Sequence, residues 1–85
     1  MTITLLTRDG CPACADALAD LERICADVPA ELEVIDVDAA AAAGDGELRA
    51  EYGDRLPVIL LDGCEHGYWE VDEARLRKDL AARAS

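Results

Sequence analysis

The stretch Ile3-Thr4-Leu5-Leu6-Thr7-Arg8-Asp9-Gly10-Cys11-Pro12-Ala13-Cys14 decides the fold of this chain of 85 residues. Its first part mixes Ile and Leu with Thr and therefore favours a short strand. Arg8-Asp9-Gly10 has the residue types of a turn. Pro12 suits the first position of a helix, where its missing N–H leaves no hydrogen bond unmade. The stretch predicts a strand followed, directly after Cys11, by a helix.

The helix that begins at Pro12 is predicted to run to about Asp27. Pro29 lies just past that end, where a proline stops a helix. Leu32–Val37 is rich in β-branched residues and is the next predicted strand. A strand, a helix and a strand in this order require a right-handed crossover, so we expect the two strands to be parallel. An apolar stripe recurs along the helix at three- and four-residue steps, formed by Cys14, Leu18, Leu21, Cys25 and Val28.

The middle of the chain predicts short helical pieces. Ala39–Ala43 continues as a helical turn until glycines interrupt it. Asp45 is placed to cap a short helix that runs to Tyr52, and Gly53 closes that helix. The sequence shows no internal repeat, and no linker separates this segment from the rest of the chain.

Two strands and a helix are expected in the last third. Val58–Leu61 is a continuous apolar run, typical of a strand buried on both faces. Asp62-Gly63 is a two-residue hairpin signal, so Cys64–Glu70 is predicted to return antiparallel to it. Asp72 can cap the last helix. The order β-α-β-α-β-β-α predicts an α/β fold with a four-stranded mixed sheet and helices on both faces, in a single domain over residues 1–85.

Charge and composition limit the classes of function. The formal net charge is −11, with a single Lys. This charge argues against nucleic-acid partners, because phosphates are bound by Lys and Arg, and against anionic membranes. No apolar run reaches the length of a membrane span. The first residues lack the basic region of a signal peptide, so we expect a cytoplasmic protein.

The expected cytoplasmic location guides the interpretation of the four cysteines. A reducing compartment does not favour two structural disulfides. A close Cys-x-x-Cys pair in a βαβ context instead indicates redox chemistry or metal binding. Cys25 lies on the apolar stripe and is interpreted as a small buried hydrophobic residue. Cys64 follows a hairpin turn, where we expect it to be exposed.

Cys11 and Cys14 are the predicted catalytic pair. The N-terminus of a helix has unpaired N–H groups and a partial positive charge, which favour a thiolate and lower the pKa of a cysteine there. The spacing of three residues also permits a disulfide. We therefore assign Cys11 as the attacking nucleophile and Cys14 as the resolving thiol, whose N–H donates to the Cys11 sulfur. Pro12 and Ala13 between them leave the approach open.

Pro57 supplies the second element of the predicted site. A proline at the start of a buried strand cannot donate a ladder hydrogen bond and therefore marks a special position. We predict that the Leu56–Pro57 peptide bond is cis and that Pro57 lies against the Cys11 sulfur. The backbone of Leu56 is then free to pair with an extended substrate. Arg8 adds a positive charge that would attract an anionic thiol or an acidic group.

Three motifs resemble the glutaredoxins. Thr7–Cys14 looks like the start of that family, where a basic residue stands three positions before a Cys-Pro-x-Cys motif. Tyr52–Val58 is similar to the segment that leads into its cis-proline, and Asp62-Gly63 matches its β-hairpin. The resemblance covers nearly the whole chain and is closest to short bacterial glutaredoxin-like proteins. It implies a thioredoxin fold and thiol–disulfide exchange.

Two departures from that family concern the ligand. True glutaredoxins usually have Tyr where this chain has Ala13. They also have a Gly-Gly pair and then an Asp that holds a carboxylate of glutathione. Gly67–Asp72 lacks that pair, and Glu70 would repel a carboxylate.

The predicted function is a thiol–disulfide oxidoreductase that acts on protein disulfides or on mixed disulfides with a small thiol. Its electrons come from a reductase or a low-molecular-weight thiol, and we expect a monomer with no bound cofactor or metal. Two alternatives are a non-catalytic binding module that presents the groove beside Pro57, and a dimer bridged by an iron–sulfur cluster through Cys11. A third would combine both motif cysteines with Cys64 and His66 in a metal site.

Overall fold

The computed structural model describes residues 1–84, and the elements follow the predicted order, except that two short helices stand where that order has one. They are β1 (Thr2–Thr7), α1 (Pro12–Asp27), β2 (Glu31–Asp36), α2 (Val37–Ala42), α3 (Glu47–Tyr52), β3 (Val58–Leu61), β4 (Cys64–Tyr68) and α4 (Glu73–Ala84).

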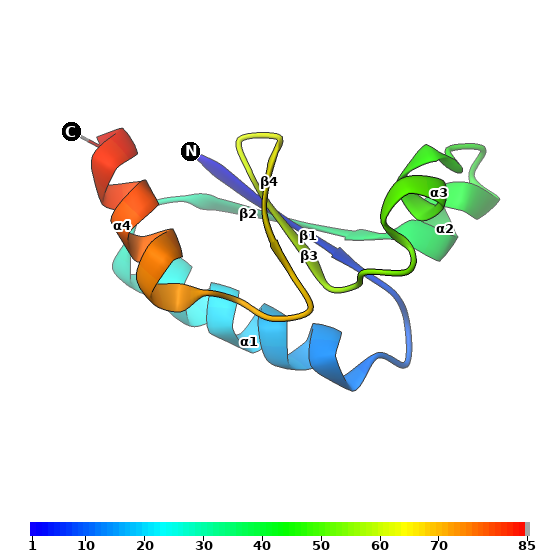
Figure 1. Cartoon of the computed structure of the whole chain (residues 1–85), viewed down its shortest axis with the longest axis horizontal. Coiled ribbons are helices and arrows are strands. Elements are labelled where there is room, and N and C mark those ends of the chain that lie inside the picture. Colours follow the sequence, from blue (N-terminus) through cyan, green and yellow to red (C-terminus); the bar gives the residue numbers. More distant parts are fainter. Residues whose placement is uncertain (85) are drawn as a thin grey trace.

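The four strands form one mixed sheet in the order β2-β1-β3-β4. β1 and β2 are parallel, whereas β3 is antiparallel to both β1 and β4. α1 and α4 cover one face of this sheet, and α2 and α3 lie together at one end of the molecule (Figure 1). The predicted α/β architecture is confirmed.

Side chains that alternate along β1 contribute to two apolar clusters. Ile3 and Leu5 face α1 and α4, where Leu21 and Leu76 complete a core with no solvent exposure. Leu6 belongs to a smaller cluster with three further buried residues, Val37, Val58 and Leu60. The alternation is the period-two pattern of a strand that is covered on both sides. All four residues of β3 are buried, as the apolar run predicts.

The predicted boundary between β2 and the following helix was wrong by one residue. β2 ends at Asp36, and Val37 is the first residue of α2. The carboxylate of Asp36 accepts hydrogen bonds from the N–H groups of Asp38 and Ala39, at 2.9 and 3.0 Å. This N-cap begins the helix and outweighs the β-propensity of Val37.

The cap of α3 also differs from the expectation. The N-cap residue is Gly46, which has no side chain to accept a hydrogen bond. Asp45 lies one position earlier, and its carboxylate accepts a hydrogen bond of 3.3 Å from the N–H of Glu47. Asp45 therefore supports the start of the helix from outside it.

The other two differences concern β4 and α1. β4 was predicted to reach Glu70 but ends at Tyr68, because Trp69 has a left-handed backbone with φ of 72°. On α1 the fully buried positions include Ala17 and Ile24, which the predicted stripe omitted. The stripe residues Leu18, Cys25 and Val28 are only partly buried against the core.

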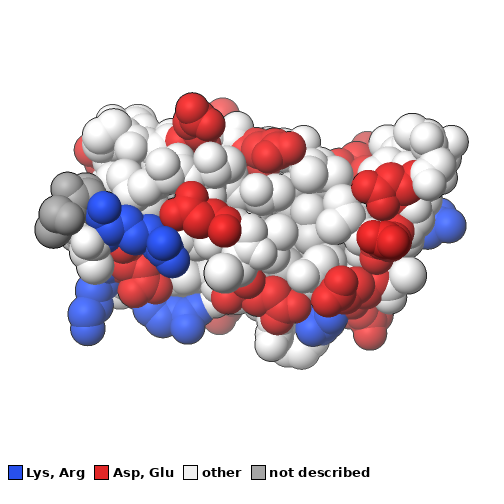
Figure 2. Space-filling model, turned by 90° about the horizontal axis from the view of Figure 1, so that it is seen from above, with Lys and Arg blue, Asp and Glu red and all other residues white. Residues whose placement is uncertain are grey.

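Acidic side chains dominate the surface seen from above in Figure 2, and Lys and Arg gather mainly near one end of the molecule. Within residues 1–84, no helix is long and apolar enough to cross a membrane.

Candidate functional site

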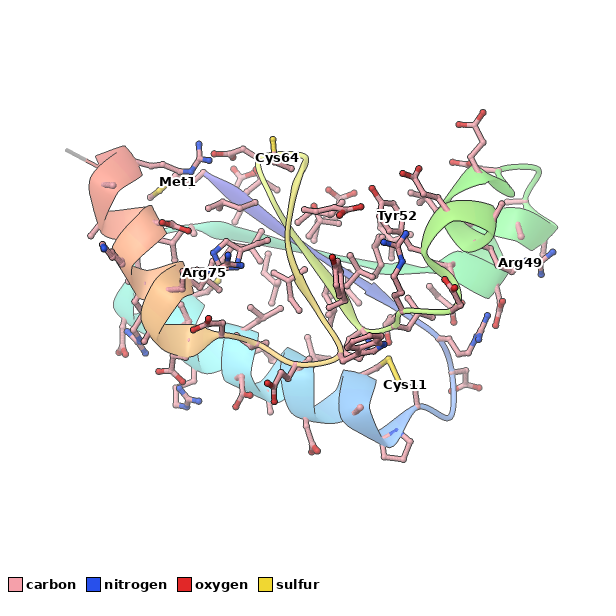
Figure 3. The ribbon with its side chains drawn as sticks, in the orientation of Figure 1. Met1, Cys11, Arg49, Tyr52, Cys64 and Arg75 are labelled. Atoms are coloured by element: carbon pink, nitrogen blue, oxygen red, sulfur yellow. A yellow bond between two sulfur atoms is a disulfide. The ribbon has the colours of Figure 1, made fainter. Side chains whose placement is uncertain are left out.

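Cys11 lies at the junction of β1 and α1 and is the N-cap of that helix, with Pro12 at its first turn. Gly10 has φ of 73°, a left-handed conformation that glycine adopts readily, and it turns the chain into the helix. Cys11 and Cys14 form a disulfide with a Cα–Cα distance of 5.2 Å. Cys11 is half-buried and Cys14 is 2 % exposed. Figure 3 shows the Cys11 sulfur on the side of α1 that faces the sheet.

The start of α1 is electrostatically suited to a negative sulfur. The N–H of Cys14 donates a hydrogen bond to Cys11 Sγ, with an N–S distance of 3.1 Å. The first turn of the helix contains no acidic residue. The unpaired N–H groups and the partial positive charge of the helix terminus are therefore not neutralised by the helix itself.

Arg8, predicted to bind substrate, holds the loop between β1 and α1 to the neighbouring helices. Its guanidinium donates two hydrogen bonds to the carboxylate of Asp38, at 2.9 and 3.1 Å, and one of 3.3 Å to the carbonyl of Gly53. These contacts hold the pKa of Asp38 below its usual range and raise the pKa of Arg8. A substrate role for Arg8 stays a prediction.

The segment that precedes β3 has the expected backbone. The Leu56–Pro57 peptide bond is cis, as predicted, and Pro57 is fully buried. The carbonyl of Pro57 accepts a hydrogen bond of 2.7 Å from the N–H of Trp69. The contact of Pro57 with the Cys11 sulfur stays a prediction. Pro12 and Ala13 are exposed beside the disulfide, and Leu56 is half-buried.

Trp69 lies near the motif, at a position that the sequence analysis did not select. It is the most exposed of the large hydrophobic residues in the described part of the chain, at 62 %. Its ring meets that of Tyr68 edge-on at 5.6 Å, and the Arg55 guanidinium stacks on Tyr68 at 5.3 Å. Trp69 also lines a hollow at the first turns of α1, next to the motif, together with Ala13, Asp16, Ala17, Asp20, Glu70 and Val71. The missing Gly-Gly pair was the one signal that this loop is unusual.

The remaining cysteines lie apart from the pair. Cys25 is partly buried, and burial raises the pKa of its thiol. Cys64 is exposed at the β3–β4 hairpin and lies well away from Cys11 in Figure 3. The side chain of His66, named above only in the alternative metal site, is 7 % exposed and pairs with Asp79 at 2.8 Å. No His, Cys, Asp or Glu side chains form a metal-binding group in the part of the chain that the structure describes.

Comparison with known proteins identifies the family. The model of the glutaredoxin-like domain (DUF836) matches residues 2–81. The chain belongs to the glutaredoxin-like domain family. Two relatives, the uncharacterized proteins Rv0508 of Mycobacterium tuberculosis and Mb0520 of Mycobacterium bovis, are each 53 % identical over 79 residues. That alignment covers 93 % of this chain and 81 % of each relative.

Solved structures place this glutaredoxin-like chain in the thioredoxin fold. A mutant thioredoxin from Halobacterium salinarum superposes with a TM-score of 0.66 at 24 % identity, over 99 % of this chain and 74 % of that one. The thioredoxin of Fasciola hepatica gives a TM-score of 0.60 at 22 % identity, over 95 % and 78 %. These likenesses confirm the thioredoxin fold predicted from the sequence.

Proposed function

We propose that this glutaredoxin-like protein is a dithiol oxidoreductase that reduces disulfides in proteins or mixed disulfides with a small thiol. The observation that carries the proposal is the asymmetry of the motif. Cys11 is half-buried at a helix N-terminus, and Cys14 is buried one turn later with its Cα 5.2 Å away. One sulfur can be reached by a partner, and the other can be reached only by the first.

The proposed reaction starts from the reduced protein. The Cys11 thiolate attacks one sulfur of the partner's disulfide, so that a Cys11–partner bond forms and the partner's S–S bond breaks. The partner's other sulfur leaves as a thiolate and takes a proton from water. Cys14 then loses its proton to water and attacks Cys11 Sγ as a thiolate, so that the Cys11–Cys14 disulfide forms, the Cys11–partner bond breaks, and the partner's second sulfur leaves as a thiolate that takes up a proton. Two electrons have passed from the dithiol to the partner.

The cycle closes when a reductase or a low-molecular-weight thiol reduces the Cys11–Cys14 disulfide. In the second case two molecules of that thiol are oxidised to their own disulfide. No bound cofactor is required for either exchange, because each step transfers a bond between sulfur atoms. We also propose that the protein works as a monomer in the cytoplasm.

Cysteine variants test the proposal in an insulin or hydroxyethyl disulfide reduction assay. Cys11→Ser should abolish the reduction of disulfides. Cys14→Ser should accumulate a mixed disulfide at Cys11, visible as an added mass. Cys64→Ser removes an exposed thiol away from the motif and serves as the matched control, with a rate like that of the wild type. Full activity of Cys11→Ser would show that the nucleophile is assigned wrongly.

Two measurements on the wild-type protein, the reduction potential and the pKa of Cys11, distinguish an oxidoreductase from a binding module. An oxidoreductase should have a measurable two-electron reduction potential and a Cys11 thiol with a pKa below the ordinary value of about 8.5. A module that only binds extended segments beside Pro57 requires neither property.

A further inference from the structure

The loop between β4 and α4 holds an exposed indole beside the disulfide. Trp69 has φ of 72°, a conformation that bulky residues rarely adopt. Its N–H is fixed by the 2.7 Å hydrogen bond to the carbonyl of Pro57. The residue is nevertheless 62 % exposed, so the loop holds it at the surface rather than in the core. Together with Ala13 of the motif, Trp69 lines one hollow.

The charges around that hollow are mostly negative. Asp16 and Glu70, which both line it, form no ion pair within residues 1–84. Asp20, the third carboxylate of the hollow, pairs with Arg23 at 3.0 Å. The hollow therefore has two uncompensated carboxylates beside an exposed aromatic face.

The arginine side chains closest in sequence to the motif and to the Trp69 loop each have an acidic partner. Arg8 is paired with Asp38 at 2.9 Å, and Arg55 lies 3.7 Å from Asp54 while its guanidinium covers two tyrosine rings. Arg75 lies 3.8 Å from Asp72. Among the described residues that line the hollow no cation balances Asp16 and Glu70, so an approaching anion would be repelled, whereas an approaching cation would be attracted.

We infer that the substrates are protein disulfides flanked by Arg or Lys, whose cationic side chain lies on the Trp69 ring between Asp16 and Glu70. The inference rests on the proposed function and specifies its substrate class. A guanidinium or ammonium group is attracted to the face of an indole, most strongly where the contact is shielded from water. Its positive charge also compensates the negative charges of the two carboxylates, which have no ion-pair partner of their own within residues 1–84. A small thiol that carries carboxylates would be repelled by the same groups.

Three matched peptides test this. Each has one cysteine joined by a disulfide to neutral hydroxyethanethiol, with Arg, citrulline or Glu at both flanking positions. Flanking charges change the reactivity of any disulfide, so each rate with the reduced protein is divided by the rate of the same peptide with dithiothreitol. At low salt this normalised rate should be about tenfold higher for the Arg peptide than for the Glu peptide, with citrulline between them. Added salt should reduce the ratio.

Variants of residues that line the hollow test whether the preference for the Arg peptide arises there. Trp69→Gly removes the ring, and glycine adopts the positive φ of this position without strain. Glu70→Gln removes one charge and keeps the shape. Both should lower the Arg-to-Glu ratio to about threefold or less. The control is Glu22→Gln, the same change at an exposed position of α1 about 16 Å along the helix from Cys11, which should keep the wild-type ratio.

A second readout does not depend on rates. Trp69 is the only tryptophan of the chain, so fluorescence emission reports on its ring alone. In the Cys14→Ser protein each peptide can be held on Cys11 as a stable mixed disulfide. The Arg peptide should change the emission of Trp69, and the citrulline peptide should change it much less.

Two results would overturn the inference while leaving the proposed function intact. One is equal normalised rates for the three peptides. The other is a wild-type ratio in both Trp69→Gly and Glu70→Gln, which would assign the preference to the net charge of the whole protein. If none of the peptides is reduced at all, the proposed function itself fails, and the substrate class fails with it.

Discussion

The N–H of Cys14 lies 3.1 Å from Sγ of Cys11, the helix N-cap, and donates a hydrogen bond to it. In this arrangement a cysteine occupies the place that Ser, Thr, Asp and Asn usually take at the start of a helix. A charged sulfur accepts such a bond more strongly than a neutral one. The hydrogen bond therefore favours the thiolate of Cys11 when the disulfide is reduced.

Three of the four reduced thiols, those of Cys11, Cys64 and Cys25, should react with iodoacetamide in a fixed order. Cys11 should be alkylated first and at the lowest pH, because the helix terminus stabilises its thiolate. Cys64 is exposed and should follow. Cys25 should react last among the accessible thiols, because burial raises its pKa. Mass spectrometry of alkylated peptides over a pH series gives the order, and a Cys11 profile that coincides with that of Cys64 would contradict the argument.

Leu21 is fully buried against the sheet, whereas Leu18 on the same helix is only partly buried. Leu21→Ala should lower the free energy of unfolding by about 3 kcal/mol, since it removes apolar contacts and leaves a cavity. Leu18→Ala makes the same chemical change and should cost about 1 kcal/mol, because less area leaves water there. Urea unfolding at constant m-value measures both. Equal losses would show that the core is arranged differently.

Much of this fold follows from local sequence signals. The apolar run Val58–Leu61 and the turn Asp62-Gly63 predict the hairpin, and both elements are present. The boundary at Val37 was not predictable from propensity, because a β-branched residue there begins a helix that the side chain of Asp36 caps. The Asp36 carboxylate, three residues before Ala39, was the signal that could have placed this boundary.

The disulfide and the cis peptide bond of the candidate site were predictable from the sequence. The contacts that other side chains make around them were not. The spacing of Cys11 and Cys14 and the position before Pro57 are local patterns, and the disulfide and the cis bond are present. Arg8 illustrates the limit, because its partner Asp38 lies 30 residues away and is brought to it only by the fold. The left-handed backbone of Trp69 is likewise set by a tertiary contact, the hydrogen bond to Pro57.

Gly53 should not tolerate a side chain. A Cβ at this position would lie 2.5 Å from the carbonyl oxygen of Arg49, closer than real Cβ atoms come. Gly53→Ala should therefore lower the free energy of unfolding by about 1–3 kcal/mol as the backbone shifts. Gly67→Ala is the control, since its Cβ would meet nothing nearer than 3.8 Å, and its thermal midpoint should stay close to that of the wild type. A wild-type midpoint for Gly53→Ala would contradict the close approach.

Glu73 on α4 joins that helix to α1 and gives stability a defined pH dependence. Its carboxylate accepts hydrogen bonds from Arg23 of α1, at 2.9 Å, and from Arg77 of α4, at 2.8 Å. These two guanidinium groups, Arg23 first, hold the pKa of Glu73 below its ordinary value. A carboxyl group with a lowered pKa in the folded state stabilises that state above the pKa of the unfolded chain. The stabilisation is lost as the pH falls through the lowered, folded-state pKa.

Glu73→Gln should therefore lower the thermal midpoint at neutral pH, and its difference from the wild type should shrink as the pH falls through the acid range. Glu22→Gln is the matched control, because its carboxylate is exposed and lies outside the ion pairs between α1 and α4. Its midpoint should follow that of the wild type at every pH. High salt should also reduce the effect of Glu73→Gln, since the pairs are partly exposed and are screened. A midpoint difference that is independent of pH would mean that the charge of Glu73 does not hold the two helices together.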